Sequence, residues 1–344
     1  MKALQFVEIQ KLELVDLPVP GIGEDELLIK TGAAVICTSD LNDLRENAFG
    51  IELPVVVGHE GAGTVVAKGR LVSDFEIGDR VATHPVHPCG QCINCRSGMG
   101  HLCLNMGHFG LNRPGVFAEY FPVRADRARR VPDSVPFTTA ALAEPVSVCL
   151  EALNQANLAP GGRLLIIGDG PFGVLIARLA QTLQLEKVII AGRHDFRLGF
   201  AAGAIQVNEK KEADAMARLR AESEIADRPP GYDAVIQAVS TAQAVRQGLS
   251  LLRSKGRLVV FSAVTGDTPI DLFDLHVREL EMVGACNDQD LLDDAIARLE
   301  MSSLALGDLV THKLPLEDYA VAFDLAAHGR EEAMKVAFVF DDIS

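Results

Sequence analysis

Short apolar runs, bracketed by polar residues and broken by glycine and proline, fill the first part of the chain, up to about residue 149. Glu26 to Lys30, Gly63 to Ala67 and Arg80 to Thr83 each fit the length and composition of a β-strand. Turn-forming residues are frequent in this part, and long helical patterns are few. The first 149 residues are therefore predicted to form a largely β domain.

The pattern changes near residue 150, where strand-like and helix-like runs begin to alternate. Arg163 to Gly168 is a continuous apolar strand bounded by glycine, as strands buried on both faces are. The other runs are helical at Ser147 to Asn157, Val174 to Leu183 and Ala242 to Leu252, and strand-like at Lys187 to Ala191, Tyr232 to Gln237 and Arg257 to Ser262. This alternation predicts a doubly wound parallel sheet over residues 150–285.

The last segment, residues 286–344, offers few elements. One helix is predicted near Leu291 to Leu299, and strands are predicted at Leu309 to Leu314 and Lys335 to Phe340. These are too few for a third domain. We expect the segment to return and complete the first domain, so the predicted class is α/β plus β.

Composition and charge exclude several kinds of partner. The chain has 344 residues, 48% of them apolar and 23% charged, and its net charge is −15. This charge argues against nucleic acid or an anionic membrane as a partner. No apolar run is long enough to span a membrane, and the first residues lack the apolar core of a secretory signal. With seven cysteines and no export signal, the expected location is a reducing cytoplasm.

Four cysteines form the most specific motif. Cys89, Cys92, Cys95 and Cys103 have the spacing C-x2-C-x2-C-x7-C, which suits one closed, tetrahedral, structural zinc ion. Disulfides fit poorly, because the first three are crowded and no export signal is present. His84, His87, His101 and His108 lie in or next to this cysteine lobe (residues 89–103), but four thiolates already complete a tetrahedron, so these histidines are expected to be surface or hydrogen-bonded residues.

A glycine motif follows the first strand of the alternating region. Gly168, Gly170 and Gly173 fit G-x-G-x-x-G between a strand and a helix. In that context the motif predicts a dinucleotide site, with the pyrophosphate at the helix N-terminus. Phe172, Ser262 and Ala263 are further expected cofactor contacts.

The end of the second strand bears on which dinucleotide binds. NAD sites place an acidic residue there, whereas this strand ends in Gly192, Arg193 and His194. Gly192 leaves room for a 2′-phosphate, and Arg193 and Arg197 offer positive charge, so NADP is favoured. NAD remains the alternative, because Asp195 can turn toward a 2′-hydroxyl.

Three further segments carry metal-binding side chains. They contain Cys37, His59 with Glu60, and Glu144. A thiolate, an imidazole and two carboxylates can hold a zinc ion by three protein ligands and leave one position for substrate. Spacing alone does not show that these residues converge.

Taken in order, Cys37-Thr38-Ser39-Asp40, Gly58-His59-Glu60, the four-cysteine lobe, Glu144-Pro145 and the glycine motif resemble the zinc-dependent medium-chain alcohol dehydrogenase family. The resemblance covers essentially the whole chain. Glu144-Pro145-Val146-Ser147 is most similar to the branch of polyol (sorbitol-type), sugar and threonine dehydrogenases.

The resemblance implies a GroES-like β domain interrupted by a Rossmann domain, and two zinc ions per chain. Cys37, His59 and Glu144 would bind the catalytic zinc, Glu60 would be a nearby or exchanging ligand, and Ser39 would accept the substrate proton. The implied reaction is hydride transfer between a secondary alcohol or its ketone and NADP(H), in a homodimer or homotetramer. The alternatives are an NAD-linked sugar or amino-alcohol dehydrogenase and, outside enzymes, a nucleotide-sensing or structural protein.

Two positions depart from the family pattern. Asn42 stands where relatives commonly have a histidine, and an amide cannot pass on a proton as imidazole does. Cys286-Asn287-Asp288 stands where polyol dehydrogenases tend to carry Arg-Tyr. Substrate recognition is therefore expected to differ from that of a sorbitol dehydrogenase.

Overall fold

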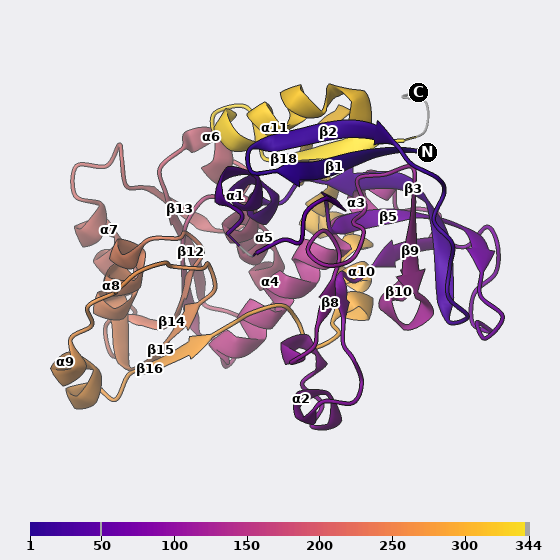
Figure 1. The fold of residues 1–344 in the computed structure, drawn as a ribbon. Helices are drawn as coiled ribbons and strands as arrows, with labels where there is room; N and C mark the ends of the chain where they lie inside the picture. The colour runs from indigo at the N-terminus through magenta and orange to yellow at the C-terminus, as the bar shows by residue number, and fades with distance from the viewer. Residues whose placement is uncertain (49, 341–344) are drawn as a thin grey trace. The chain divides into compact units, whose positions relative to one another are not determined.

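The structure is a computed structural model that describes residues 1–48 and 50–340. The chain divides into two units (Figure 1). One comprises Met1–Ser147 and the chain from Gln289 onward, and the other comprises Val148–Asp288. The sequence prediction set the corresponding boundaries at residues 150 and 286.

The first unit is built mainly of strands. Its largest sheet has the order β10-β6-β5-β3-β18-β17, with β9 also paired to β3; a smaller sheet has the order β2-β1-β4, and β7 pairs with β8. The strands are β1 (Lys2–Glu8), β2 (Lys11–Asp16), β3 (Glu26–Val35), β4 (Val55–Val56), β5 (Glu60–Lys68), β6 (Arg80–Thr83), β7 (Val86–His87), β8 (Gly107–His108), β9 (Tyr120–Arg124), β10 (Ala128–Arg130), β17 (Val310–Leu314) and β18 (Lys335–Val339).

Helices are short in this unit. They are α1 (Thr38–Glu46), α2 (Ile93–Arg96), α3 (Phe137–Ala140), the start of α4 (Ala143–Ala156), α10 (Leu292–Leu299) and α11 (Tyr319–His328). The prediction of a single helix after residue 286 was wrong, because α11 follows α10. Among its ten residues only Ala322 and Phe323 are buried, and Val321 is exposed, so the sequence shows no clear apolar stripe.

The end of the chain is part of the first unit. β18 pairs antiparallel with β3, with Ala337 opposite Val35, and parallel with β17. Aromatic side chains from distant segments pack in the same core; the rings of Phe117 and Phe338 meet edge to face with centroids 5.1 Å apart. This pairing brings Lys335, the first residue of β18, to the sheet that carries the candidate site.

The second unit is the predicted doubly wound sheet. Its six strands are parallel in the order β13-β12-β11-β14-β15-β16, which is the 3-2-1-4-5-6 order of dinucleotide-binding folds. The elements are β11 (Arg163–Ile167), α5 (Pro171–Leu179), β12 (Lys187–Gly192), α6 (Asp195–Leu198), β13 (Ile205–Asn208), α7 (Ala215–Glu222), β14 (Tyr232–Gln237), α8 (Ala242–Leu251), β15 (Leu252–Val260), α9 (Leu272–Val277) and β16 (Glu281–Gly284).

Burial explains why this sheet was readable from the sequence. All five residues of β11 are buried, as a strand covered on both faces requires. The strand order reverses between β11 and β14, so the loops after these strands flank the point where ligands bind in such sheets.

No helix within residues 1–48 and 50–340 is long and apolar enough to cross a membrane.

Candidate active site

Cys37, His59 and Glu60 lie together in the first unit. Their ligand atoms are all within 4.8 Å of one another, and all three residues are buried. The pairing of β3 with β5 explains the convergence, because Val35 at the end of β3 lies opposite Glu60 at the start of β5. Cys37 follows two residues after β3, and His59 immediately precedes β5.

Asp40 fixes both of its neighbours in this group. Its Oδ2 accepts a hydrogen bond from the backbone N of Cys37 at 2.8 Å, and its Oδ1 lies 3.2 Å from Nδ1 of His59. The second ring nitrogen, Nε2, lies 3.4 Å from the Ser39 hydroxyl. A carboxylate behind a histidine is the usual way to orient an imidazole for metal binding, so Nε2 is the nitrogen presented to a metal.

Charge in the site favours a cation. Burial alone would lower the pKa of His59, but the charge and hydrogen bond of Asp40, together with the Cys37 thiol, raise this pKa well above its usual value. Burial, and then the nearby Glu60 carboxylate, raises the pKa of Cys37. A negative field that holds a proton on a buried imidazole is also a field that suits a divalent metal ion.

Glu60 has a partner from the far end of the chain. Lys335 Nζ donates to Oε1 and Oε2 of Glu60 at 2.6 and 2.5 Å, with side-chain exposures of 2% and 0%. Burial would lower the pKa of Lys335, but Glu60 and then Cys37 raise it. The ion pair therefore holds the Glu60 carboxylate beside the other two candidate ligands.

Glu144 lies outside the 4.8 Å group, although it is buried. Burial raises the pKa of its carboxyl to about 7, His59 opposes this shift, and Glu60 adds to it. The charges of both His59 and Glu60 therefore act on the Glu144 carboxyl. Ser147, on the same helix, donates from its hydroxyl to the backbone oxygen of Glu144 at 2.7 Å.

These donors fit zinc chemically. A thiolate, an imidazole nitrogen and a carboxylate oxygen are the ligand types of catalytic zinc sites, which keep one position for substrate. Asn42, one turn along α1 from Thr38, is turned to Arg45, whose Nη2 donates to its Oδ1 at 3.2 Å. The Asn42 amide therefore adds no further hydrogen-bonded group to the pair formed by the Ser39 hydroxyl and the His59 imidazole.

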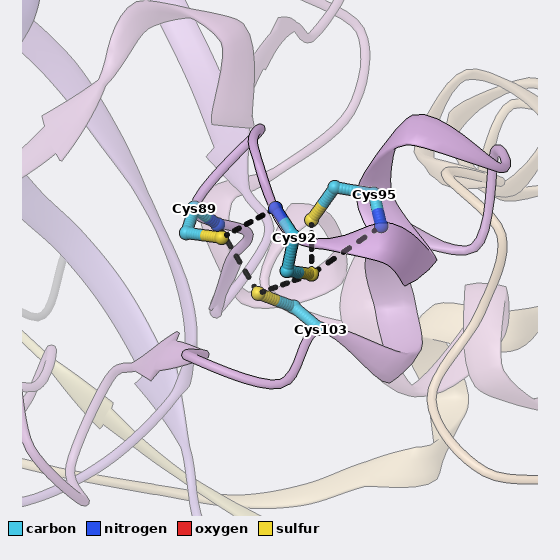
Figure 2. A group of neighbouring side chains, drawn as sticks. All are labelled: Cys89, Cys92, Cys95 and Cys103. Carbon is cyan, nitrogen blue, oxygen red and sulfur yellow. Dashed lines mark hydrogen bonds between the residues drawn. The ribbon is translucent and has the colours of Figure 1, made fainter.

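The four cysteines of the lobe converge around one point (Figure 2). The Sγ atom of Cys92 lies 3.4 Å from that of Cys95 and 3.9 Å from that of Cys103. A tetrahedral zinc with bonds of 2.3 Å has sulfurs about 3.8 Å apart, so the spacing fits. Backbone amides donate hydrogen bonds to the sulfurs: Cys92 N donates to Cys89 Sγ at 3.4 Å, and Asn105 N donates to Cys103 Sγ at 3.3 Å.

The pKa values of two thiols in the lobe are shifted in opposite directions. Amide hydrogen bonds from Cys95 and Leu104 lower the pKa of Cys92 to about 6. Desolvation, and then the neighbouring Cys92 and Cys103 sulfurs, raises the pKa of Cys95 to about 12. A metal ion bound here would replace the remaining thiol protons and so stabilise the sulfurs as thiolates.

Not all histidines near the lobe are the surface or hydrogen-bonded residues that the sequence had led us to expect. His84 and His87 are buried, so neither is a surface residue. His84 Nδ1 accepts from Val86 N at 3.1 Å, but within the described part of the chain neither ring nitrogen of His87 has a hydrogen-bond partner. Burial, and then Arg113, lowers the pKa of His87 to about 2, so this ring is neutral. It packs on Phe109 with ring centroids 4.8 Å apart.

The glycine motif has the geometry of a dinucleotide turn. Gly168 has φ +127°, and a Cβ there would lie 2.6 Å from the backbone oxygen of Ala238. A Cβ on Gly173 would lie 1.9 Å from the Gly168 oxygen, so helix α5 packs directly on the turn. A Cβ on Gly170 would meet nothing within 4 Å, and this residue is the N-cap of α5. The open approach to this helix end fits a pyrophosphate.

The other expected cofactor residues lie in the same unit. Gly192 ends β12, Arg193 is exposed just beyond it, and Arg197 lies on α6. Phe172, on α5, packs edge to face on Phe261 with centroids 5.3 Å apart. Ser262 follows β15, and its backbone N donates to Gln237 Oε1 at 3.2 Å; Ala263 is the next residue.

Sequence reasoning gave no role to Asp40, Lys335 or Asp169. Asp40 sits inside the Cys37 motif, so its nearness to Cys37 was a signal. Lys335 is 275 residues from Glu60 and has no local signal. Asp169 lies inside the glycine motif, where the pattern accepts any residue.

Comparison with known proteins identifies the family. Residues 23–133 match the family model for the alcohol dehydrogenase GroES-like domain, and residues 171–300 match the model for zinc-binding dehydrogenases. A sorbitol dehydrogenase of Bombyx mori is 31% identical over 93% of each chain. An L-threonine 3-dehydrogenase of Escherichia coli K12 is 30% identical over 96% of this chain and 97% of its own.

Solved structures agree with these matches. A putative zinc-binding dehydrogenase from Sinorhizobium meliloti 1021, bound to NADP, superposes with a TM-score of 0.90 at 26% identity, over 98% of this chain and 99% of its own. The chain belongs to the zinc-dependent medium-chain alcohol dehydrogenase family, whose members are oxidoreductases. The predicted fold, a GroES-like domain interrupted by a Rossmann domain, is confirmed.

Proposed function

We propose that this protein transfers a hydride between a secondary alcohol, polyol-like or sugar-like, or its ketone, and a nicotinamide dinucleotide. The observation that carries the proposal is the buried group of Cys37, His59 and Glu60. A catalytic zinc would be held by Cys37 and His59 with Glu144 as third ligand, and Glu60 as the nearby or exchanging carboxylate. When bound, zinc supplies a Lewis acid that makes an alcohol easier to deprotonate.

The proton of the alcohol has an acceptor in this chain. Ser39 Oγ lies 3.4 Å from His59 Nε2, so a substrate oxygen beside the imidazole would also be beside this hydroxyl. Asp40 keeps the His59 ring in place through Nδ1. Because Asn42 is turned to Arg45, a proton taken up by Ser39 would pass to water or another group rather than along α1.

The second metal site has a separate role. The cysteine lobe would hold a structural zinc, with Cys89, Cys92, Cys95 and Cys103 filling all four positions. No position would then be left for a substrate, so a zinc bound there would stabilise the lobe and take no part in hydride transfer.

The identity of the alcohol is the finer part of the proposal. The sorbitol and threonine dehydrogenases among the relatives support a polyol or an amino alcohol as substrate.

The sequence favours NADP(H) from Gly192 and Arg193, with NAD(H) as the alternative. The position of Asp169 bears on the choice between these two cofactors. A cytoplasmic homodimer or homotetramer is proposed from the family, and light scattering of the purified protein tests the assembly.

The test is a matrix of initial rates. Purified, zinc-loaded protein is assayed at 340 nm with NAD and NADP against polyols, sugars, threonine and simple secondary alcohols, and in reverse with the matching ketones. We expect at least one secondary alcohol to be oxidised, and the rate to disappear on dialysis against a zinc chelator and return with zinc. Fully zinc-loaded protein that binds a dinucleotide but oxidises none of these alcohols and reduces none of the ketones would count against the proposal.

A further inference from the structure

A carboxylate stands beside the end of β12, although no acidic residue ends that strand. Asp169 belongs to the glycine motif after β11, and the residue is only 8% exposed. Its Oδ2 accepts from the backbone N of Arg193 and of His194, both at 2.7 Å, and lies 3.1 Å from His194 Nδ1. Asp169 is thus anchored to the two residues that follow the strand.

Gly192 makes this position available to Asp169. A Cβ on Gly192 would lie 2.4 Å from the Cβ and 2.7 Å from the Oδ2 of Asp169, far inside van der Waals contact. The absence of a side chain at the strand end therefore does not leave an empty space for a 2′-phosphate. That space holds a carboxylate supplied by the neighbouring loop.

One oxygen of Asp169 remains available. All three contacts of its carboxylate go to Oδ2, and among the residues that the structure describes none donates to Oδ1. An acceptor held in this way beside the end of the second strand is what an adenosine ribose hydroxyl requires. The same oxygen would repel a 2′-phosphate, because both are negative.

The two competing groups are less well placed. Arg193 is exposed, so water and salt weaken its attraction for a phosphate. Asp195 already accepts from Asn208 Nδ2 and pairs with Lys211 Nζ. A fixed, nearly buried charge outweighs an exposed and screened one, so Asp169 decides the electrostatics at this point.

We propose that Asp169 selects the dinucleotide, standing in for the acidic residue missing from the end of β12 and favouring NAD(H) over NADP(H). This inference rests on the proposed function, since it assumes a nicotinamide dinucleotide at the glycine motif. It reverses the preference for NADP that Gly192 and Arg193 suggest in the sequence.

The test is equilibrium binding, which does not depend on turnover. Dissociation constants of NADH and NADPH are measured by titration calorimetry on the zinc-loaded protein and on Asp169→Asn. Asparagine keeps the shape and an oxygen for the loop amides but removes the charge. The wild type is expected to bind NADH more tightly, and in D169N the ratio of the NADPH to the NADH constant is expected to fall about tenfold or more, as loss of one charge-assisted contact implies.

Asp195→Asn is the comparison, because it makes the same chemical change at the first residue of α6, a carboxylate already held by Asn208 and Lys211, and its ratio should stay within about twofold of the wild type. A purely structural role for Asp169 would weaken both cofactors equally and leave the ratio unchanged, and that result overturns the inference. So does a wild-type preference for NADPH, or a shift in D195N but not in D169N. Binding of neither dinucleotide to the wild type would instead refute the proposed function on which the inference rests.

Discussion

Asp40 shows how a single residue connects local structure to the candidate chemistry. One of its oxygens accepts from the Cys37 amide at the start of α1, and the other lies beside His59 Nδ1. The residue therefore joins the beginning of a helix to the imidazole that would bind metal. Neither of the candidate ligands that it touches can shift without breaking one of these contacts.

Substitution of Asp40 by Asn is expected to impair the metal site without unfolding the protein. Loss of the carboxylate removes the partner that fixes the His59 ring, and such losses cost about 10- to 100-fold in zinc affinity or activity. Competition with a zinc chelator and kcat/KM measure the two effects.

The matched control for Asp40→Asn is Glu46→Gln, which lies on the same helix with its side chain 59% exposed. It should leave both quantities within about twofold of the wild type. If D40N bound zinc as tightly as the wild type, Asp40 would have no positioning role.

At the residue scale, local motifs could be recognised in the sequence, but side-chain contacts between distant residues could not. The glycines and the four cysteines were recognisable because each set is local, and Cys37, His59 and Glu60 because they occur within known motifs. Lys335 was not predictable, since its pairing with Glu60 depends on where the last strand lies. The interpretation of Gly192 as open space was incomplete for the same reason, because Asp169 fills that space from another loop.

At the scale of elements, the site depends on the order β5-β3-β18 in the large sheet. β3 and β5 bring Cys37 to His59 and Glu60, and β18 brings Lys335 to Glu60. The buried ion pair therefore ties the last strand of the chain to the first ones. A pair of this kind contributes little as a whole, but losing one partner is costly.

Replacement of Lys335 by Met tests the contribution of the ion pair between Lys335 and Glu60 to stability. Met fills similar volume but leaves the Glu60 carboxylate buried without its partner, which is expected to cost about 3–5 kcal/mol of unfolding free energy. The double variant Glu60→Gln with Lys335→Met should cost less than the sum of the single variants by about 1–3 kcal/mol. Urea unfolding of all three proteins gives these values.

The control for Lys335→Met is the exposed pair of Lys2 and Glu317, whose side chains are 47% and 49% exposed. Lys2→Met should leave the unfolding midpoint essentially unchanged, since exposed pairs contribute little. Equal effects of K2M and K335M would show that burial does not govern the Glu60 pair.

Elements with a strong pattern were predicted, and those decided by tertiary contacts were missed. β11, β12, β14 and α8 have continuous apolar or clear helical patterns, and the structure has them near the expected bounds. β16 is a short edge strand whose residues are partly or fully exposed, and α11 has no single apolar stripe. Their positions follow from the neighbours they pair with or pack against, which one sequence does not display.

At the scale of the whole molecule, three functions would belong to separate parts of the chain. The group around Cys37 would hold the reactive zinc, the cysteine lobe a structural zinc, and the second unit the dinucleotide. The first two can be separated by mutation, because their ligands come from different segments and no residue belongs to both groups.

Zinc content measured together with hydride transfer in Cys37→Ser decides whether the group around Cys37 is a zinc-dependent active site. We expect two zinc ions per chain in the wild type and one in C37S, with dinucleotide binding kept and alcohol oxidation lost. Cys103→Ser is the comparison, since it should lose the other zinc and lower the thermal midpoint. A C37S protein that kept both its zinc ions and its hydride transfer would show that Cys37 holds no catalytic zinc.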